Sequence, residues 1–183
     1  MKSKLSIRHA IILCIAITYS TLAFGQESIH RKNIIKTNSF ALLGKDYNLA
    51  YERFFSTKSS LIFSVHYLDN IKFFWSQYQG VYANIGYRFY PTHKLKNTPT
   101  GFWISPRIGA AYFVDNYRED EIPKMYYAFV TGEFGYQWAL KRGFTIDLGT
   151  GFSLLYQKEV RGDRTYRELG GLPSIIIGLG YSF

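Results

Sequence analysis

The chain has 183 residues, a formal net charge of +9, one cysteine and 19% aromatic residues. This length suits a single domain, and a lone cysteine excludes an intramolecular disulfide. The 16 tyrosines and 15 phenylalanines need a large apolar surface to pack against, which bulk water does not offer.

Residues 1–25 have the layout of a secretory signal peptide. Three basic residues precede an apolar run at 11–17, and small residues end the segment before Gln26. The apolar run is too short to cross a bilayer comfortably as a helix. We therefore expect residues 26–183 to form the mature domain. Loss of the three basic residues would lower the net charge from +9 to +6, a mild excess that does not indicate nucleic-acid binding.

From about residue 33 onward, apolar residues alternate with small or polar ones. The stretch "GFTIDLGTGFSLLYQ" at 143–157 shows the pattern, which is typical of a strand with one apolar face. Eight segments repeat this alternation, each near the ~9–11 residues that a tilted strand needs to cross a membrane. The candidate strands are 33–43, 47–54, 60–68, 80–90, 101–113, 125–138, 143–156 and 173–183.

The connections predict an antiparallel, all-β, up-and-down barrel. No helix is expected between strands, so neighbours should be antiparallel. Short and long connections alternate along the chain, as in outer-membrane barrels. Two connections break the alternation: "GKD" at 44–46 is short, and "PTHKLKNTP" at 91–99 is long. Pro106 cannot donate a ladder hydrogen bond, so a bulge or an irregular end is expected there.

The alternating faces distinguish a membrane barrel from a soluble one. One face holds large apolar residues, whereas the other holds charged residues and many glycines. A soluble barrel would have to crowd the large rings inside, whereas a transmembrane barrel turns them toward lipid. Aromatic residues on the apolar face also gather at both strand ends, as interfacial girdles do. The two sets are Tyr47, Tyr67, Tyr112, Tyr126 and Tyr156, and Phe89, Phe102, Trp138, Phe144 and Phe183.

The chain ends on "GLGYSF", in which Gly178, Tyr181 and Phe183 match the Gly-x-x-aromatic-x-aromatic ending of outer-membrane barrels. With this ending, the mature chain resembles the small eight-stranded outer-membrane barrels, in the class of the outer-membrane protein A membrane domain and outer-membrane protein X. The resemblance implies location in the bacterial outer membrane, contact with outer-membrane lipid, and recognition by the barrel-assembly machinery. Ile176 departs from it, because a polar residue usually stands there. The family has no shared catalytic residues.

Charged residues on the inward face are expected to fill the barrel. An eight-stranded barrel is just wide enough for its own side chains, and buried charges need partners. The predicted network pairs three cations with three carboxylates: Lys36, Arg88 and Arg107 with Glu52, Glu133 and Asp147. Arg107, Glu133 and Asp147 are expected to lie together. The alternative, a porin-like ion path, is opposed by the small diameter.

An enzyme would need a nucleophile and a base. Ser64 and His66 share one face of a strand, but no complete triad is visible in the sequence. Small barrels that modify outer-membrane lipid exist, so this class stays open as an alternative. His30 and His93 have no metal-ligand partner at suitable spacing, so neither a metal nor a cofactor is expected.

The leading expectation is a non-enzymatic barrel that binds a partner or supports the envelope. An extracellular ligand would bind through loops at 69–79, 114–124 and 157–171. The last loop contains Arg161-Gly162-Asp163, an integrin-binding tripeptide that is equally ordinary turn chemistry.

Overall fold

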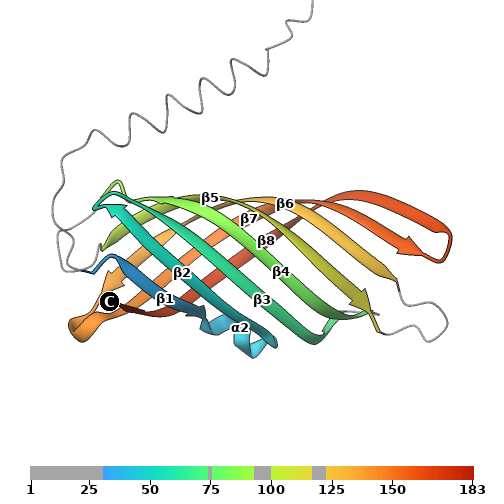
Figure 1. The fold of residues 1–183 in the computed structure, drawn as a ribbon, viewed down its shortest axis with the longest axis horizontal. Helices are drawn as coiled ribbons and strands as arrows, with labels where there is room; N and C mark the ends of the chain where they lie inside the picture. The colour runs from blue at the N-terminus through green and yellow to red at the C-terminus, as the bar shows by residue number, and fades with distance from the viewer. Residues whose placement is uncertain (1–30, 74–75, 93–99, 117–122) are drawn as a thin grey trace, which may run out of the picture.

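The computed structural model describes residues 31–73, 76–92, 100–116 and 123–183 (Figure 1). The predicted signal peptide at 1–25, together with His30 and His93, lies outside the described residues. Most of the 91–99 connection and part of the 114–124 loop lie outside them as well.

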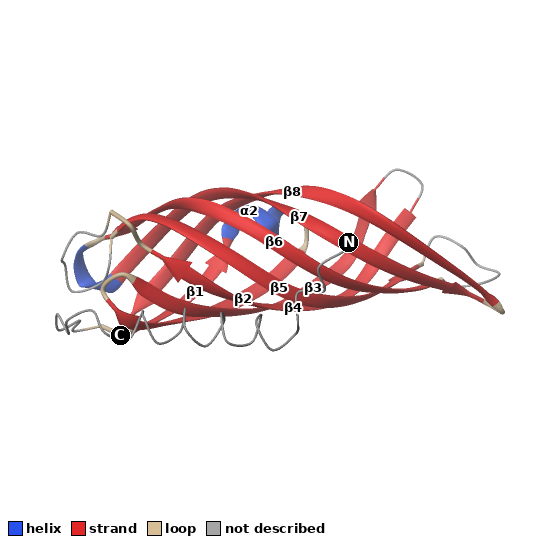
Figure 2. Cartoon of the chain, turned by 90° about the horizontal axis from the view of Figure 1, so that it is seen from above, coloured by secondary structure: helices blue, strands red, loops and turns tan. Residues whose placement is uncertain are grey.

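Eight strands form one closed sheet (Figures 1 and 2). Each strand pairs antiparallel with the next, and β8 returns to pair with β1, so the predicted antiparallel up-and-down barrel is confirmed. The elements are β1 (Asn33–Asn38), α2 (Ser39–Leu43), β2 (Asp46–Ser56), β3 (Ser59–Phe73), β4 (Ser76–Phe89), β5 (Gly101–Asp115), β6 (Lys124–Ala139), the 3₁₀ turn η1 (Lys141–Gly143), β7 (Phe144–Arg161) and β8 (Arg164–Ser182). Neither described helix has the length and apolar character needed to cross a membrane.

The barrel has two unlike ends. We call the end where β1 begins and β8 finishes the terminal end, and the end where β3–β4, β5–β6 and β7–β8 connect the hairpin end. The β7–β8 hairpin, orange to red in Figure 1, reaches farthest at the hairpin end. The loops predicted at 69–79 and 157–171 are therefore largely strand, since β3 continues to Phe73, β4 begins at Ser76, and β7 and β8 leave only 162–163 between them.

The first candidate strand, 33–43, is wrong beyond residue 38. Residues 39–43 form the short helix α2, so a helix does intervene between two strands. The Asn38 side chain explains the change: its Oδ1 accepts from Ile177 N, and its Nδ2 donates to Ile175 O, both at 3.2 Å. One side-chain amide thus replaces the peptide that would have extended β1 along β8. Because α2 lengthens the connection, "GKD" is only the last part of it.

Pro106 interrupts the ladder without a bulge. On the β4 side, Gly86 pairs with Arg107 and the next recorded pair is Phe89 with Ile104, in the same register. On the β6 side, Pro106 stays in register opposite Gly132. The irregularity lies within β5 and not at its end. It is confined to the β4 side, because proline lacks one N–H and an N–H group bonds only one neighbouring strand.

Large apolar side chains cover the outside of the barrel. Between 37% and 61% of their surface is exposed at most of the predicted outward positions along the strands, whereas Ile146 is half-buried. Examples from different strands are Leu49, Phe63, Ile85, Ile108, Phe134, Leu148 and Ile177. Of the ten girdle aromatics, all except Phe102 are among the exposed large residues. Small and polar residues face much of the interior, as the alternation predicts, but large side chains such as Phe54, Trp103 and Phe129 also point inward.

Two glycines make room for the largest side chain of the interior. Trp103 is fully buried, and Gly149 stands on β7 opposite Gly135 of β6. A Cβ atom on Gly149 would lie 2.7 Å from Phe134 O and 2.9 Å from Trp103 Cζ2. The inward glycines therefore have a packing role at this level of the barrel.

We expect Gly149→Val to lower barrel stability by about 1–3 kcal/mol, the usual cost of overpacking. Gly132→Val is the matched control, because a Cβ atom at outward-facing Gly132 meets nothing within 4 Å. Urea unfolding followed by tryptophan fluorescence measures both variants. Equal destabilisation by the two substitutions would contradict the packing role.

Candidate functional site

An apolar layer closes the terminal end of the interior. Ile34, Phe54, Tyr90 and Trp103 form one cluster, and each has at most 1% of its surface exposed. The Phe54 and Tyr90 rings lie 5.5 Å apart. These residues come from β1, β2, β5 and the residue after β4, so side chains from around the ring meet across its centre.

Four buried charges lie next to this layer. Lys36 Nζ is 2.5 Å from Glu52 Oε2 and 2.6 Å from Asp147 Oδ2. Arg88 Nη1 is 3.2 Å from Asp147 Oδ1 and 3.5 Å from Glu52 Oε2. Each cation contacts both carboxylates, and the group is neutral overall. We call these four residues the charge cluster.

Polar and aromatic neighbours complete the charge cluster. Lys36 Nζ donates to Gln137 Oε1 at 2.5 Å, and Ser60 Oγ donates to Glu52 Oε1 at 2.5 Å. Tyr90 Oη is 2.8 Å from that same Glu52 oxygen. The Arg88 guanidinium lies over the Trp103 ring, 3.9 Å from its centroid. Such partners are what a buried charge needs in order to stay ionised.

A second, smaller group lies farther toward the hairpin end. Arg107 Nε is 2.7 Å from Glu133 Oε2, although the two atoms are poorly aligned for a hydrogen bond. Arg107 Nη1 donates to Asn84 Oδ1 at 3.0 Å. We call Arg107 and Glu133 the ion pair.

The six predicted charges therefore divide into two groups, and the placing of Asp147 beside Arg107 and Glu133 is wrong. The register gives the reason. Asp147 stands opposite Gln137, whereas Glu133 stands opposite Gly151. Four residues along a strand is about 13 Å at the usual rise per residue, which is too far for contact.

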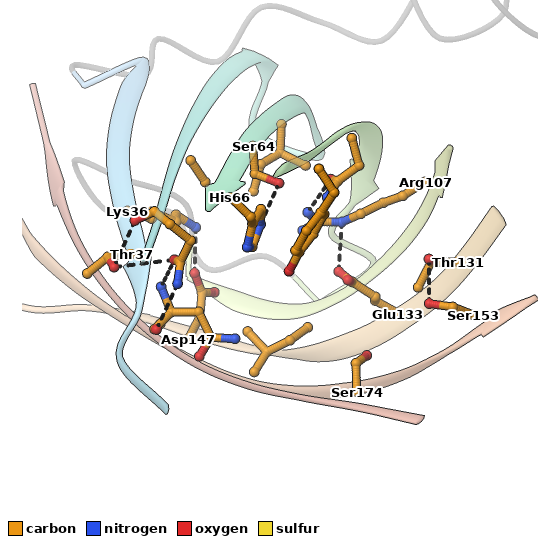
Figure 3. A pocket seen from close by; sticks show the side chains of 18 of the residues that line it. Lys36, Thr37, Ser64, His66, Arg107, Thr131, Glu133, Asp147, Ser153 and Ser174 are labelled. Atoms are coloured by element: carbon orange, nitrogen blue, oxygen red, sulfur yellow. Dashed lines mark hydrogen bonds and ion pairs between the residues drawn. The ribbon is translucent and has the colours of Figure 1, made fainter. Parts of the chain in front are cut away.

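His66 stands at the centre of a polar chain, of which Figure 3 shows the contact with Ser64. His66 Nδ1 lies 2.9 Å from Asp46 Oδ1, and its Nε2 lies 3.3 Å from Ser64 Oγ. Tyr82 Oη donates to Asp46 Oδ2 at 2.9 Å, and its ring stacks on His66 with centroids 3.9 Å apart. A proton on Nδ1, facing Asp46, leaves Nε2 free to accept from Ser64. The order of hydroxyl, imidazole and carboxylate is that of a nucleophile, its base and the group that orients the base.

A small polar cavity of about 160 Å³ joins these groups. Side chains of the ion pair, of the charge cluster and of the Ser64–His66 chain line it, together with Thr131, Ser153 and Ser174 (Figure 3). We call it the polar cavity. Within the described residues, no group of three or more His, Cys, Asp or Glu side chains is arranged to hold a metal ion.

Asp46, Tyr82 and Gln137 are the main interior residues that the sequence analysis missed. The sequence pattern places Asp46 in a connection, but Asp46 is the first residue of β2 and stands opposite Leu68. Gln137 shares its strand face with Glu133, so parity alone could have identified it. No sequence signal indicated that Asp46 would reach His66, since that contact depends on where β2 begins.

The residues of the predicted assembly signal close the ring. Tyr181 stands opposite Ile35, and Gly178 opposite Asn38. Phe183 N donates to Asn33 O at 2.9 Å, and Asn33 N donates to Phe183 O at 3.2 Å. The tail is therefore the closing strand of the barrel; its reading by an assembly machinery stays a prediction.

The Arg161-Gly162-Asp163 tripeptide lies at the tip of the β7–β8 hairpin. Gly162 has a φ of 49°, and Asp163 is exposed. The left-handed backbone favours glycine at this position in a two-residue turn. The Arg161 side chain pairs with Glu159 within the hairpin.

No family model matches the chain, and no curated protein or solved structure matches it either.

Breaking the ion pair should destabilise the barrel. Glu133→Gln leaves the Arg107 guanidinium without its counter-charge, a loss of about 3–5 kcal/mol for a buried pair. Arg107→Gln should cost much less in that background than in the wild type. The same cycle between Arg107 and Asp147 should show a weaker coupling, because the two residues belong to different groups. Urea titrations of the single and double variants measure both couplings, and additivity at Arg107 and Glu133 would contradict the pairing.

Proposed function

We propose that the chain is a non-enzymatic barrel of the bacterial outer membrane, closed to ions and similar in class to the outer-membrane protein A membrane domain and outer-membrane protein X. Its role is to bind a partner at the hairpin end or to support the envelope. The signal peptide at 1–25, the assembly machinery as a transient partner and outer-membrane lipid as the surroundings belong to the same proposal.

One observation carries the membrane setting: the polarity of the barrel is inverted relative to that of a soluble protein. Every strand exposes large apolar residues on its outer face, although the short β1 exposes only Ile35. In contrast, the charged residues Lys36, Glu52, Arg88 and Asp147 are buried. Soluble monomers rarely expose contiguous apolar patches beyond a few hundred Å². Lipid is the solvent in which such a surface is stable.

The filled terminal end supports a barrel that does not conduct. The apolar layer and the neighbouring charge cluster occupy the interior at that end, and the two cations are held by two carboxylates from other strands. A hydrated ion would have to break these contacts in order to pass. The strand-built hairpins β3–β4 and β7–β8, together with the loop predicted at 114–124, would offer a partner its surface at the hairpin end.

Cell fractionation tests the location. The mature protein should begin at Gln26 and sediment with the outer membrane, because residues 1–25 would be removed on export. Amino-terminal sequencing together with density-gradient fractionation gives the answer. Recovery from the soluble periplasm, or a retained Met1, would refute the proposal.

Conductance measurements in planar bilayers test whether the barrel is closed to ions. The purified wild-type protein should give no steady conductance under conditions in which a general porin, added as the control, opens normally. A reproducible open conductance that changes in Arg107→Gln would favour a narrow pore instead.

A second candidate, a lipid-modifying hydrolase or acyltransferase, is favoured by the Ser64–His66–Asp46 geometry. In that reaction, Ser64 Oγ would attack an ester carbonyl while His66 Nε2 takes its proton, and Asp46 would orient the imidazole. The ester C–O bond would then break, the leaving alcohol would take the proton from His66, and water or a second lipid hydroxyl would remove the acyl group from Ser64. The Asn84 amide stands opposite Ser64 on the neighbouring strand and offers a donor for the developing oxyanion.

Lipid profiles decide between the two candidates. If the barrel is an enzyme, membranes that carry the wild type should contain a modified lipid that is absent without the protein and absent with Ser64→Ala. Ser60→Ala is the matched control, since Ser60 lies on the same strand and face but bonds Glu52. Identical lipid profiles with and without the wild type would exclude this second candidate.

A further inference from the structure

A second interior cavity lies toward the hairpin end and differs in character from the polar cavity. Its volume is about 510 Å³, within the roughly 300–1,000 Å³ of small-molecule sites. Aliphatic and aromatic side chains dominate its wall, including Ile71, Phe113, Phe129, Leu155 and Leu172. No charged residue is among the described residues that line it. We call it the apolar cavity.

This wall is unexpected at the open end of a barrel. A vestibule filled with water would be lined by polar groups, yet here the charge cluster and the ion pair lie on the terminal side of the apolar cavity, and the half-buried Asp46 and the buried Asp115 near the hairpin end do not line it. Apolar cavities do not hold ordered water well, because water needs polar partners. The wall therefore suits an apolar occupant.

The barrel wall beside the apolar cavity is incomplete. β8 pairs with β1 only from Gly178 to Ser182, and beyond Gly178 its described strand partner is β7 alone. There, α2 contacts both β8 and β2 in place of a continuous β1, which leaves a gap in the hydrogen-bonded wall. Leu172 occupies an inward position on β8, but 57% of its surface is exposed. We call this gap the seam.

The seam lies among lipid-facing side chains. Ile175 and Ile177 of β8 point outward beside it, and both are exposed. The exposed Phe40 and Leu42 of α2 lie on its other side. Ile175 also lines the polar cavity together with Thr37 and Asn48, so the interior reaches the outer surface at this place. Four residues line both cavities: Tyr82, Phe129, Ser153 and Ser174.

We propose that the apolar cavity binds one unbranched hydrocarbon chain, which enters from the membrane through the seam. The chain is either that of a free fatty acid or one acyl chain of a phospholipid whose head group stays outside. A hydrocarbon chain needs no charged or hydrogen-bonding partner, so it can pack against the uncharged wall of the apolar cavity. Its binding is stabilised by burial of apolar surface away from water or by close packing. It would reach the seam by lateral diffusion in lipid. The site rests on the membrane setting proposed above, but not on any reaction of Ser64.

Binding is measured on the full mature barrel in a fluorinated surfactant, whose chains mix poorly with hydrocarbon. Palmitic acid is one probe, and palmitoyl-oleoyl phosphatidylethanolamine is the other. Native mass spectrometry should show saturation at one palmitate per barrel and one phospholipid per barrel, with each probe displacing the other. Heat-modifiable gel mobility verifies that every sample is folded.

Neighbouring alanines supply a matched pair of variants. Ala111 lines the apolar cavity, whereas Ala110 is exposed on the outer face. Ala111→Trp should weaken binding of both probes at least about tenfold, since excluding only two methylenes suffices for that loss. Ala110→Trp should bind like the wild type. If Ala111→Trp does not fold, Leu155→Asn replaces it, with Leu154→Asn on the lipid face as its control.

Each outcome has one meaning. One-to-one binding that is lost only in the inward variant supports the site. Binding of palmitate but not of phospholipid upholds the cavity and overturns entry of a lipid-borne chain through the seam. Folded barrel that binds neither probe, or equal loss in both alanine variants, overturns the site. That failure leaves the outer-membrane location intact, because fractionation tests location separately.

Discussion

A closed ring of eight strands offers each side chain only two environments, a narrow interior or the outer surface. The backbone groups of neighbouring strands hydrogen-bond to one another around the ring. The levels of the barrel therefore differ mainly in the side chains that point inward. In this chain, an apolar layer, the charge cluster, the ion pair, the Ser64–His66 chain and the apolar cavity follow one another from the terminal end to the hairpin end. The polarity of the interior therefore changes along the axis, whereas large apolar side chains are exposed on the outer face of all eight strands.

Neutrality governs the interior charges. Removing an ionised group from water is expensive unless its partners compensate for the lost hydration. The charge cluster achieves this with two cations and two carboxylates from β1, β2, β4 and β7, and Gln137 and Ser60 add hydrogen bonds. Because these strands are not all neighbours, the contacts cross the ring and fix its cross-section at that level. These contacts tie four strands together near the terminal end.

Alternation along each strand was enough to predict eight strands, their antiparallel order and the direction of nearly every side chain. It could not predict the register between strands, and register decides that Asp147 meets Lys36 and Arg88 and not Glu133. Alternation also failed at Phe40 and Leu42, whose spacing suits a strand, because the Asn38 side chain ends the pairing before them. The charged stretch at 157–171 reads as a loop by composition, yet it pairs as a hairpin whose strands extend beyond the apolar belt. The contact of Asp46 with His66 could not be predicted either, because it also depends on register. It joins residues 20 apart in the sequence, which the pairing of β2 with β3 brings together.

The bonds between Asn33 and Phe183 have a consequence for the order of folding. They join residues from opposite ends of the described chain, whereas every other strand pairing is between sequence neighbours. Loop closure over so long a segment is entropically costly and slow, so the local hairpins form before the ring does. Until closure, β1 and β8 both present unpaired edges, which are templates for association with other chains. Closure of the ring thus removes both of these edges at once.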